Sequence, residues 1–65
     1  MKFNIKNLEK IRIESGTDIR EMAKIIGVSH QKYYDFLHEY GTPTLKTITL
    51  IAKRLEIHPK ELLEF

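Results

Sequence analysis

The side chains with the most varied chemistry are concentrated between residues 30 and 38 of this 65-residue chain. This stretch offers an imidazole, an amide, an ammonium, a phenol and a carboxylate, on His30, Gln31, Lys32, Tyr34 and Asp35. Such groups donate and accept several hydrogen bonds, as recognition of a polar partner requires. The chain has no Cys, and its His residues are too far apart for a common zinc motif. It also has no catalytic Ser, His and Asp arrangement and no glycine-rich phosphate loop. We therefore expect a binding protein without a metal, a cofactor or enzymatic activity.

Short helices must position these side chains, because glycine and proline divide the chain into pieces with helical periodicity. We expect helices over residues 8–15, 18–26, 29–38 and 44–55, and a short one from Pro59. Asp18, Ser29 and Thr44 stand where an N-cap side chain would accept a hydrogen bond from the first helical turn. Gly16 and Gly27 would end the helices before them. No segment alternates strictly between apolar and polar residues, so the expected fold is all-α with five short helices.

The apolar residues of these segments recur at steps of three and four, which predicts one shared core. The residues expected to face it are Leu8, Ile11, Met22, Ala23, Ile26, Val28, Tyr33, Phe36, Leu37, Leu45, Ile48, Ile51, Ala52, Leu55, Leu62 and Leu63. A chain of this length forms a single domain, which we assign to residues 1–65. It is also too short to enclose a deep substrate pocket easily.

The composition excludes several classes of protein. An apolar fraction of 42% beside 31% charged residues is typical of a folded domain and not of a disordered segment. No apolar run approaches the ~18 residues of a membrane span. No apolar run follows the first lysine as it would in a secretory signal. We therefore expect a soluble, cytoplasmic protein.

Residues 19–38 carry the most informative spacing. Ala23 stands four positions before Gly27, and residues 27–29 separate two short helices. Ala23 would let two crossing helices approach closely, and Gly27 would supply the positive φ of a tight turn. This pattern is typical of a helix-turn-helix unit, whose second helix projects from the body of the domain. The alternative interpretation is an all-helical core that binds no ligand.

Four runs of sequence resemble a known family. They are residues 8–16 (LEKIRIESG), 21–29 (EMAKIIGVS), 43–48 (PTLKTI) and 51–55 (IAKRL) continuing to 61–63 (ELL). The chain resembles the Cro/repressor-type (XRE) helix-turn-helix family over almost its whole length. The resemblance implies a compact, five-helix, lambda-repressor-like domain that binds double-stranded DNA and regulates transcription, usually as a dimer. The third helix, about residues 29–38, would then be the recognition helix.

The resemblance also implies roles for particular residues. The outward face of the third helix would read bases through His30, Gln31, Lys32, Tyr34 and Asp35. A Gln can bond adenine twice, a Lys can reach guanine, and an Asp can accept from cytosine. Phosphates would be bound by Arg20, Thr42, Thr44 and Lys46. The alternatives are a solvated helix face for the base-reading set and a simple helix cap for Thr44. Arg12 suits an ion pair as well as a DNA contact.

The net charge of +2 is weak support for a nucleic-acid partner, because the charge is unevenly distributed. Residues 17–41 hold three basic and four acidic side chains, whereas residues 1–16 and 42–65 carry +2 and +1. Phosphate neutralisation supplies most non-specific affinity for DNA, so a slightly acidic unit would bind it weakly. Ile19 also stands where the family usually has a phosphate-binding Gln. These features, with Tyr33, Tyr34 and Tyr40, favour an alternative, a protein-interaction module such as an antirepressor or an assembly factor.

The function expected first is that of a sequence-specific transcriptional regulator of bacterial, phage or mobile-element type. It would act as a repressor and bind a palindromic operator as a homodimer. Three apolar residues, Leu50, Leu63 and Phe65, would form the dimer surface if they converge on one side of the molecule. Control would come from concentration, dimerisation or a protein partner.

Overall fold

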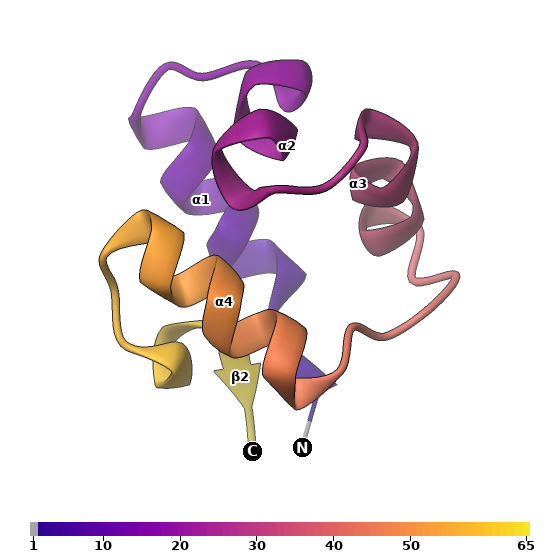
Figure 1. The fold of residues 1–65 in the computed structure, drawn as a ribbon, viewed down its shortest axis with the longest axis vertical. Coiled ribbons are helices and arrows are strands. Elements are labelled where there is room, and N and C mark those ends of the chain that lie inside the picture. The colour runs from indigo at the N-terminus through magenta and orange to yellow at the C-terminus, as the bar shows by residue number, and fades with distance from the viewer. Residues whose placement is uncertain (1) are drawn as a thin grey trace.

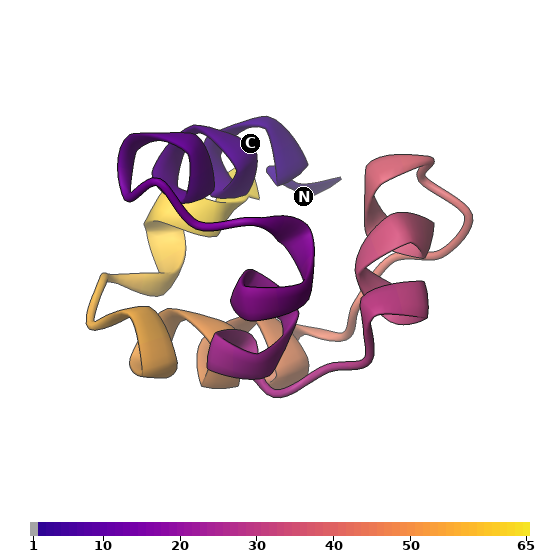
Figure 2. The same cartoon turned by 90° about the horizontal axis from the view of Figure 1, so that it is seen from above.

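The computed structural model describes residues 2–65. Its α-helices are α1 (Ile5–Glu14), α2 (Ile19–Ile26), α3 (His30–Leu37) and α4 (Leu45–Leu55), followed by a 3₁₀ helix, η1 (Pro59–Leu62). Two short strands, β1 (Lys2–Phe3) and β2 (Leu63–Glu64), pair in antiparallel fashion and bring the two ends of the chain together (Figure 1). Figure 2 shows α1 and α4 on opposite sides of the molecule, with α2 between them and α3 standing to one side.

The expectation of a mainly helical fold is confirmed, but of the five short helices expected only four are α-helices. The residues from Pro59 onward form a four-residue 3₁₀ helix, which begins where the His58 carbonyl accepts from the backbone N–H of Glu61 at 2.9 Å. Such a short segment, followed at once by β2, leaves no room for a regular α-helical turn. The two strands were not expected either. Each has only two residues, too few for an alternating pattern to show in the sequence.

Each α-helix begins at a polar side chain that accepts a hydrogen bond from the backbone N–H three residues later. The acceptors are Asn4, Asp18, Ser29 and Thr44, at 3.0, 2.8, 3.1 and 3.2 Å. These bonds satisfy donors that the first helical turn would otherwise leave unpaired. The sequence-based assignment of Asp18, Ser29 and Thr44 as caps is confirmed.

Each α-helix also ends in the same way, at a residue with a left-handed backbone conformation. The four residues are Gly16, Gly27, Glu39 and Glu56, with φ values of 71°, 81°, 56° and 57°. Around each of them, two backbone bonds of 2.9–3.2 Å link the N–H groups after the helix to carbonyls of its last turn. Glycine adopts this conformation without strain, whereas Glu39 and Glu56 adopt it at a cost.

The helices enclose one apolar core. Its buried members are Phe3, Leu8, Met22, Ala23, Ile26, Tyr33, Phe36, Ile48, Ile51, Ala52 and Leu62. Ile11, Leu37, Leu55 and Leu63 pack partly buried at its margin. The expectation for Leu45 is wrong, since it lies at the edge of the apolar stripe of α4 and is 53% exposed. Phe3 was not expected in the core, where its ring meets that of Phe36 edge-on at 5.4 Å.

Candidate nucleic-acid interface

The turn between α2 and α3 has the geometry that the sequence predicts. Gly27 has φ 81° and ψ 29°, and the Val28 N–H donates to the Ala23 carbonyl at 2.9 Å. Ser29 then caps α3, so only three residues separate the two helices. Ala23 is almost fully buried and allows the close packing of α2 in the core. The helix-turn-helix geometry is therefore present.

A second constraint on this turn comes from α4 and was missed by sequence reasoning. A Cβ atom added to Gly27 would lie 3.2 Å from both Cζ and Nε of Arg54. The guanidinium of Arg54 thus lies directly against the turn. The residues around Gly27 give no indication of this contact, because Arg54 and Gly27 are far apart in the sequence.

The turn leaves α3 attached to the domain along its inner face alone. Tyr33 and Phe36 are buried, and Leu37 is partly buried. Figure 2 shows α3 at one side of the molecule, and α2 is the helix with which it packs most extensively. One side of α3 is therefore left available to a partner.

The outer face of α3 carries most of the predicted base-reading residues. His30, Gln31, Lys32 and Tyr34 are exposed, and Asp35 is partly buried. The rings of His30 and Tyr34 meet edge-on with centroids 6.5 Å apart. Gln31 Nε2 donates to Asp35 Oδ1 at 3.4 Å. Lys32 points elsewhere, with its Nζ 5.9 Å from the centre of the Phe36 ring. The structure thus brings four of the five residues together as two pairs, and Lys32 belongs to neither pair.

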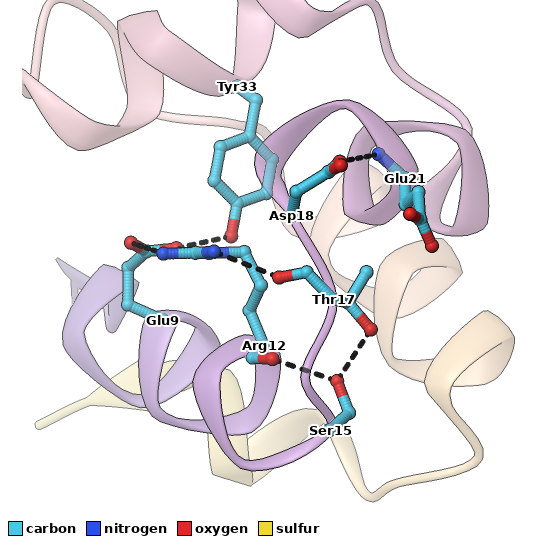
Figure 3. Close-up of polar contacts among 7 residues, drawn as sticks. All are labelled: Glu9, Arg12, Ser15, Thr17, Asp18, Glu21 and Tyr33. Atoms are coloured by element: carbon cyan, nitrogen blue, oxygen red, sulfur yellow. Dashed lines mark hydrogen bonds and ion pairs between the residues drawn. The ribbon is translucent and has the colours of Figure 1, made fainter.

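The inner face of α3 is anchored to α1 by a polar network (Figure 3). The Tyr33 hydroxyl donates to Glu9 Oε2 at 2.7 Å. Glu9 also accepts from Arg12 Nε at 2.7 Å and from Nη2 at 3.0 Å, and Arg12 Nη1 donates to the Thr17 carbonyl at 2.9 Å. The network joins α3, α1 and the loop before α2. Arg12 therefore forms the ion pair that the sequence left as one of two possibilities.

The contacts of this network shift the pKa values of Glu9 and Tyr33 in opposite directions. The hydrogen bonds from Arg12, with a contribution from Tyr33, hold the pKa of the Glu9 carboxyl below its usual value. Burial, with the nearby Glu9 carboxylate, raises the pKa of the Tyr33 hydroxyl above its usual value. Tyr33 therefore stays a neutral donor and Glu9 a charged acceptor at neutral pH.

The predicted phosphate-binding residues fall into two groups. Thr42 and Thr44 border a depression between α3 and α4, together with Lys32 and Arg54. Thr44 also caps α4, so its hydroxyl is already engaged by the backbone N–H of Thr47. The second group comprises Arg20, on the first turn of α2, and Lys46, on the first turn of α4. Both are exposed but line no part of this depression.

Arg54 changes the net charge around the helix-turn-helix turn. Residues 17–41 carry a net charge of −1, but Arg54 from α4 brings one further cation to the turn of the helix-turn-helix. Lys32 and Arg54 border the same depression. The local field is therefore less acidic than the sequence segment alone indicates.

The predicted dimer residues lie on two elements, α4 and β2 with the residue after it. Leu50 is 50% exposed and lines the depression beside Gly27 and Arg54. Leu63 pairs with Phe3 in the small sheet, and Phe65 is 94% exposed beyond it. Leu50 therefore lies on α4 beside the helix-turn-helix turn, whereas Leu63 and Phe65 lie in β2 and just after it.

Comparison with known families agrees with this geometry. A family model described as helix-turn-helix matches residues 8–62. The chain belongs to the Cro/repressor-type helix-turn-helix family. Helix-turn-helix domains of this family bind DNA and regulate transcription, and they are generally not enzymes. Searches of curated proteins and of solved structures gave no significant match.

Two features are absent from residues 2–65, which the structure describes. None of the described helices is long and apolar enough to cross a membrane. Within the same residues, no group of three His, Cys, Asp or Glu side chains is placed to bind a metal ion.

Proposed function

We propose that this protein is a sequence-specific repressor that binds a palindromic operator as a dimer through α3. The observation that carries the proposal is the outward polar face of α3, which the Gly27 turn and the buried Tyr33 present to one side. A helix presented in this way fits the major groove of B-DNA. In a dimer, two such helices would enter successive major grooves about 34 Å apart.

Gln31 is the residue best placed to discriminate between bases. It is exposed on the first turn of α3, and its bond to Asp35 occupies only one of its two amide hydrogens. The second amide hydrogen would remain free to bond the acceptor that adenine presents in the major groove. The amide oxygen would accept from the adenine amino group. Tyr34 and His30 lie beside it and would contact a neighbouring base or sugar.

The proposed phosphate contacts flank this reading face. Arg20 would bind the backbone on the α2 side, and Thr42, Thr44 and Lys46 would bind it on the α4 side. Lys32 and Arg54, the two cations that border the depression, would strengthen phosphate binding on the α4 side. Neutralised phosphates make binding depend steeply on salt, so affinity should fall as salt is raised.

The test is selection of bound sequences from a pool of random duplexes, followed by titration of variants on the selected site. We expect Gln31→Ala to lose about 1–3 kcal/mol of discrimination at one base pair. Lys46→Ala should weaken binding to all duplexes similarly and reduce the salt slope by about one. Lys53→Ala is the matched control, because Lys53 is an exposed cation of α4 outside the proposed contacts.

Unchanged discrimination by Gln31→Ala would overturn the assignment of the reading face. Failure to bind mixed-sequence duplex at low salt would overturn DNA binding itself. That result would favour the second candidate, a protein-interaction module. Its supporting observations are the net −1 charge of residues 17–41 and the exposure of Tyr34 and Tyr40, at 42% and 79%.

A further inference from the structure

The depression between α3 and α4 has a surface chemistry that contact with a DNA backbone uses only in part. Its volume is about 450 Å³, within the range of sites that hold small molecules. Both charged residues that line it, Lys32 and Arg54, are cations. Much of the remaining surface is apolar and comes from Ile26, Val28, Phe36, Pro43, Leu50 and Ile51. The depression therefore combines positive charge with an apolar wall.

The charge of this depression has a single sign, unlike that of the two depressions that border α1. Three Lys and three Glu residues line the larger of those two. The other is lined by Lys10 together with Glu14 and Glu61. Cations and carboxylates that share a surface offset each other's field, whereas two cations without an acidic neighbour add together. An anionic ligand is therefore favoured at the depression between α3 and α4.

The two cationic side chains are not engaged by other groups in the part of the chain that the structure describes. Within residues 2–65, neither Lys32 nor Arg54 forms an ion pair. Arg54 reaches the Gly27 turn from α4, which lies beside that turn (Figure 1). Lys32 projects from α3 with its Nζ 5.9 Å from the centre of the Phe36 ring. The N–H donors of both side chains are therefore available to an anion.

The apolar part of the depression sets a second requirement for its ligand. Phe36 and Ile51 belong to the core, and they are 2% and 1% exposed. Leu50 stands beside them on α4 and is 50% exposed. A phosphate group would pair with the cations but leave Leu50 in water. An anion that carries an apolar body would satisfy the charge and also remove this apolar surface from water.

We propose that this depression binds a small amphipathic carboxylate, which is a ligand with one anionic group on an apolar body. The carboxylate pairs with Lys32 and Arg54, and the apolar body lies against Leu50. A few convergent polar groups on a mainly apolar concave surface are the usual composition of a small-molecule site.

This ligand would act as an effector of the DNA-binding domain itself. Lys32, Thr42 and Thr44 border the depression and are also proposed DNA contacts, so ligand and duplex would compete for them. By linkage, each would lower the affinity of the other by the same factor. The effect on DNA rests on the proposed function, whereas binding of the carboxylate does not.

The test uses indole-3-acetate as the probe, titrated into isotope-labelled protein without DNA and followed by amide chemical shifts. We expect a dissociation constant of about 1 mM, typical of a small ligand on an open site, with shifts at Gly27, Leu50 and Arg54. Indole-3-acetamide has the same apolar body without the charge, and acetate has the charge without the indole. Each should bind at least about fivefold more weakly, because each uses one part of the site.

Two substitutions separate the charged part of the site from the apolar part. Arg54→Gln should reduce the preference for indole-3-acetate over its amide at least about twofold. Leu50→Asn should weaken both ligands at least about threefold. Lys53→Gln and Leu45→Asn are the matched controls, because both residues are exposed on α4 outside the depression, and both should bind like the wild type. Circular dichroism of each variant verifies that the fold is retained.

Four results would overturn the proposal. The first is the absence of shifts at a tenfold excess of probe over the expected dissociation constant. The second is equal binding of indole-3-acetate, its amide and acetate, which would indicate an adventitious additive only. The third is unchanged binding in both Arg54→Gln and Leu50→Asn, which would place the ligand elsewhere. The fourth is an acidic peptide that shifts these amides where the probe does not, which would assign the surface to a protein partner.

Titration of the selected duplex with and without the probe distinguishes this inference from the proposed function. A protein that binds the probe but no duplex retains the carboxylate site and refutes the proposed function. A protein that binds duplex but not the probe does the reverse. Where both bind, saturating probe should weaken duplex binding, and an unchanged affinity would refute the competition.

Discussion

Replacing Tyr33 by Phe removes one oxygen atom from the core side of α3. The lost hydrogen bond is 2.7 Å long and ends on a charged acceptor, Glu9. Bonds of this kind contribute about 1.5–3 kcal/mol to stability. Glu9 keeps its two bonds from Arg12, and its side chain is 22% exposed, so water can replace the hydroxyl. The phenyl ring leaves no large cavity. We therefore expect a loss of about 1–1.5 kcal/mol, at or just below the lower limit of that range.

Urea and thermal unfolding measure this loss. A destabilisation of 1 kcal/mol lowers the midpoint of a domain of this size by roughly 4–8 °C. Tyr34→Phe is the matched control, because it removes the same atom from the adjacent, 42% exposed residue. Its free energy of unfolding should stay within about 0.5 kcal/mol of the wild type. Equal stability of Tyr33→Phe and the wild type would refute the anchoring role of the network.

The pH dependence gives a second readout of the same change. The folded-state pKa of Glu9 is lowered, so its contribution to stability is complete above the unfolded pKa of about 4.3. That contribution is lost as the pH falls through the lowered folded-state pKa. In Tyr33→Phe one cause of the lowered pKa is absent, so the loss of stability in acid should be smaller. An identical acid dependence in the two proteins would contradict this account.

Three further predictions concern the helix ends and the ion pair. Gly27→Ala should destabilise the fold by about 1–2 kcal/mol in urea unfolding, because φ is 81° and the new Cβ would meet Arg54. Gly41→Ala, with no atom within 4 Å of the new Cβ and no positive φ, should be nearly neutral. Glu56→Gly should raise the free energy of unfolding by about 0.5–1 kcal/mol, because glycine adopts the left-handed conformation at this position without strain. Glu56→Ala should not raise it, and equal effects of the two substitutions would show that Glu56 is not strained. Glu9→Gln should lower stability at pH 7 but approach the wild type near pH 3, and a constant difference across this range would exclude the charge as the cause.

The features that sequence reasoning located correctly depend on residues close together along the chain. Asp18 and Ser29 cap their helices through bonds that reach only three residues ahead. The turn at Gly27 closes through the carbonyl of Ala23, also a near neighbour. Such local interactions leave a compositional pattern that can be recognised without the fold. The left-handed ends at Glu39 and Glu56 left no such pattern, because glutamate is not typical of that position.

The candidate site was only partly predictable, because some of its contacts join residues far apart along the chain. The outward residues of α3 follow from helical periodicity once Tyr33 and Phe36 are assigned to the core. Periodicity does not show that Lys32 turns toward the α4 side. It also does not show that Leu50 lies beside the turn, away from the strand that holds Leu63.

The sequence by itself therefore determined the helices, the apolar face of each and the helix-turn-helix unit. Only the tertiary structure decided which side chains from different helices meet. It joined Tyr33 to Glu9 across 24 residues of chain and placed Arg54 against Gly27. Caps and turns are set by bonds between near neighbours, whereas these contacts depend on how whole helices pack against a common core. The anchoring of α3 and the charge beside the turn before it were decided at that second level.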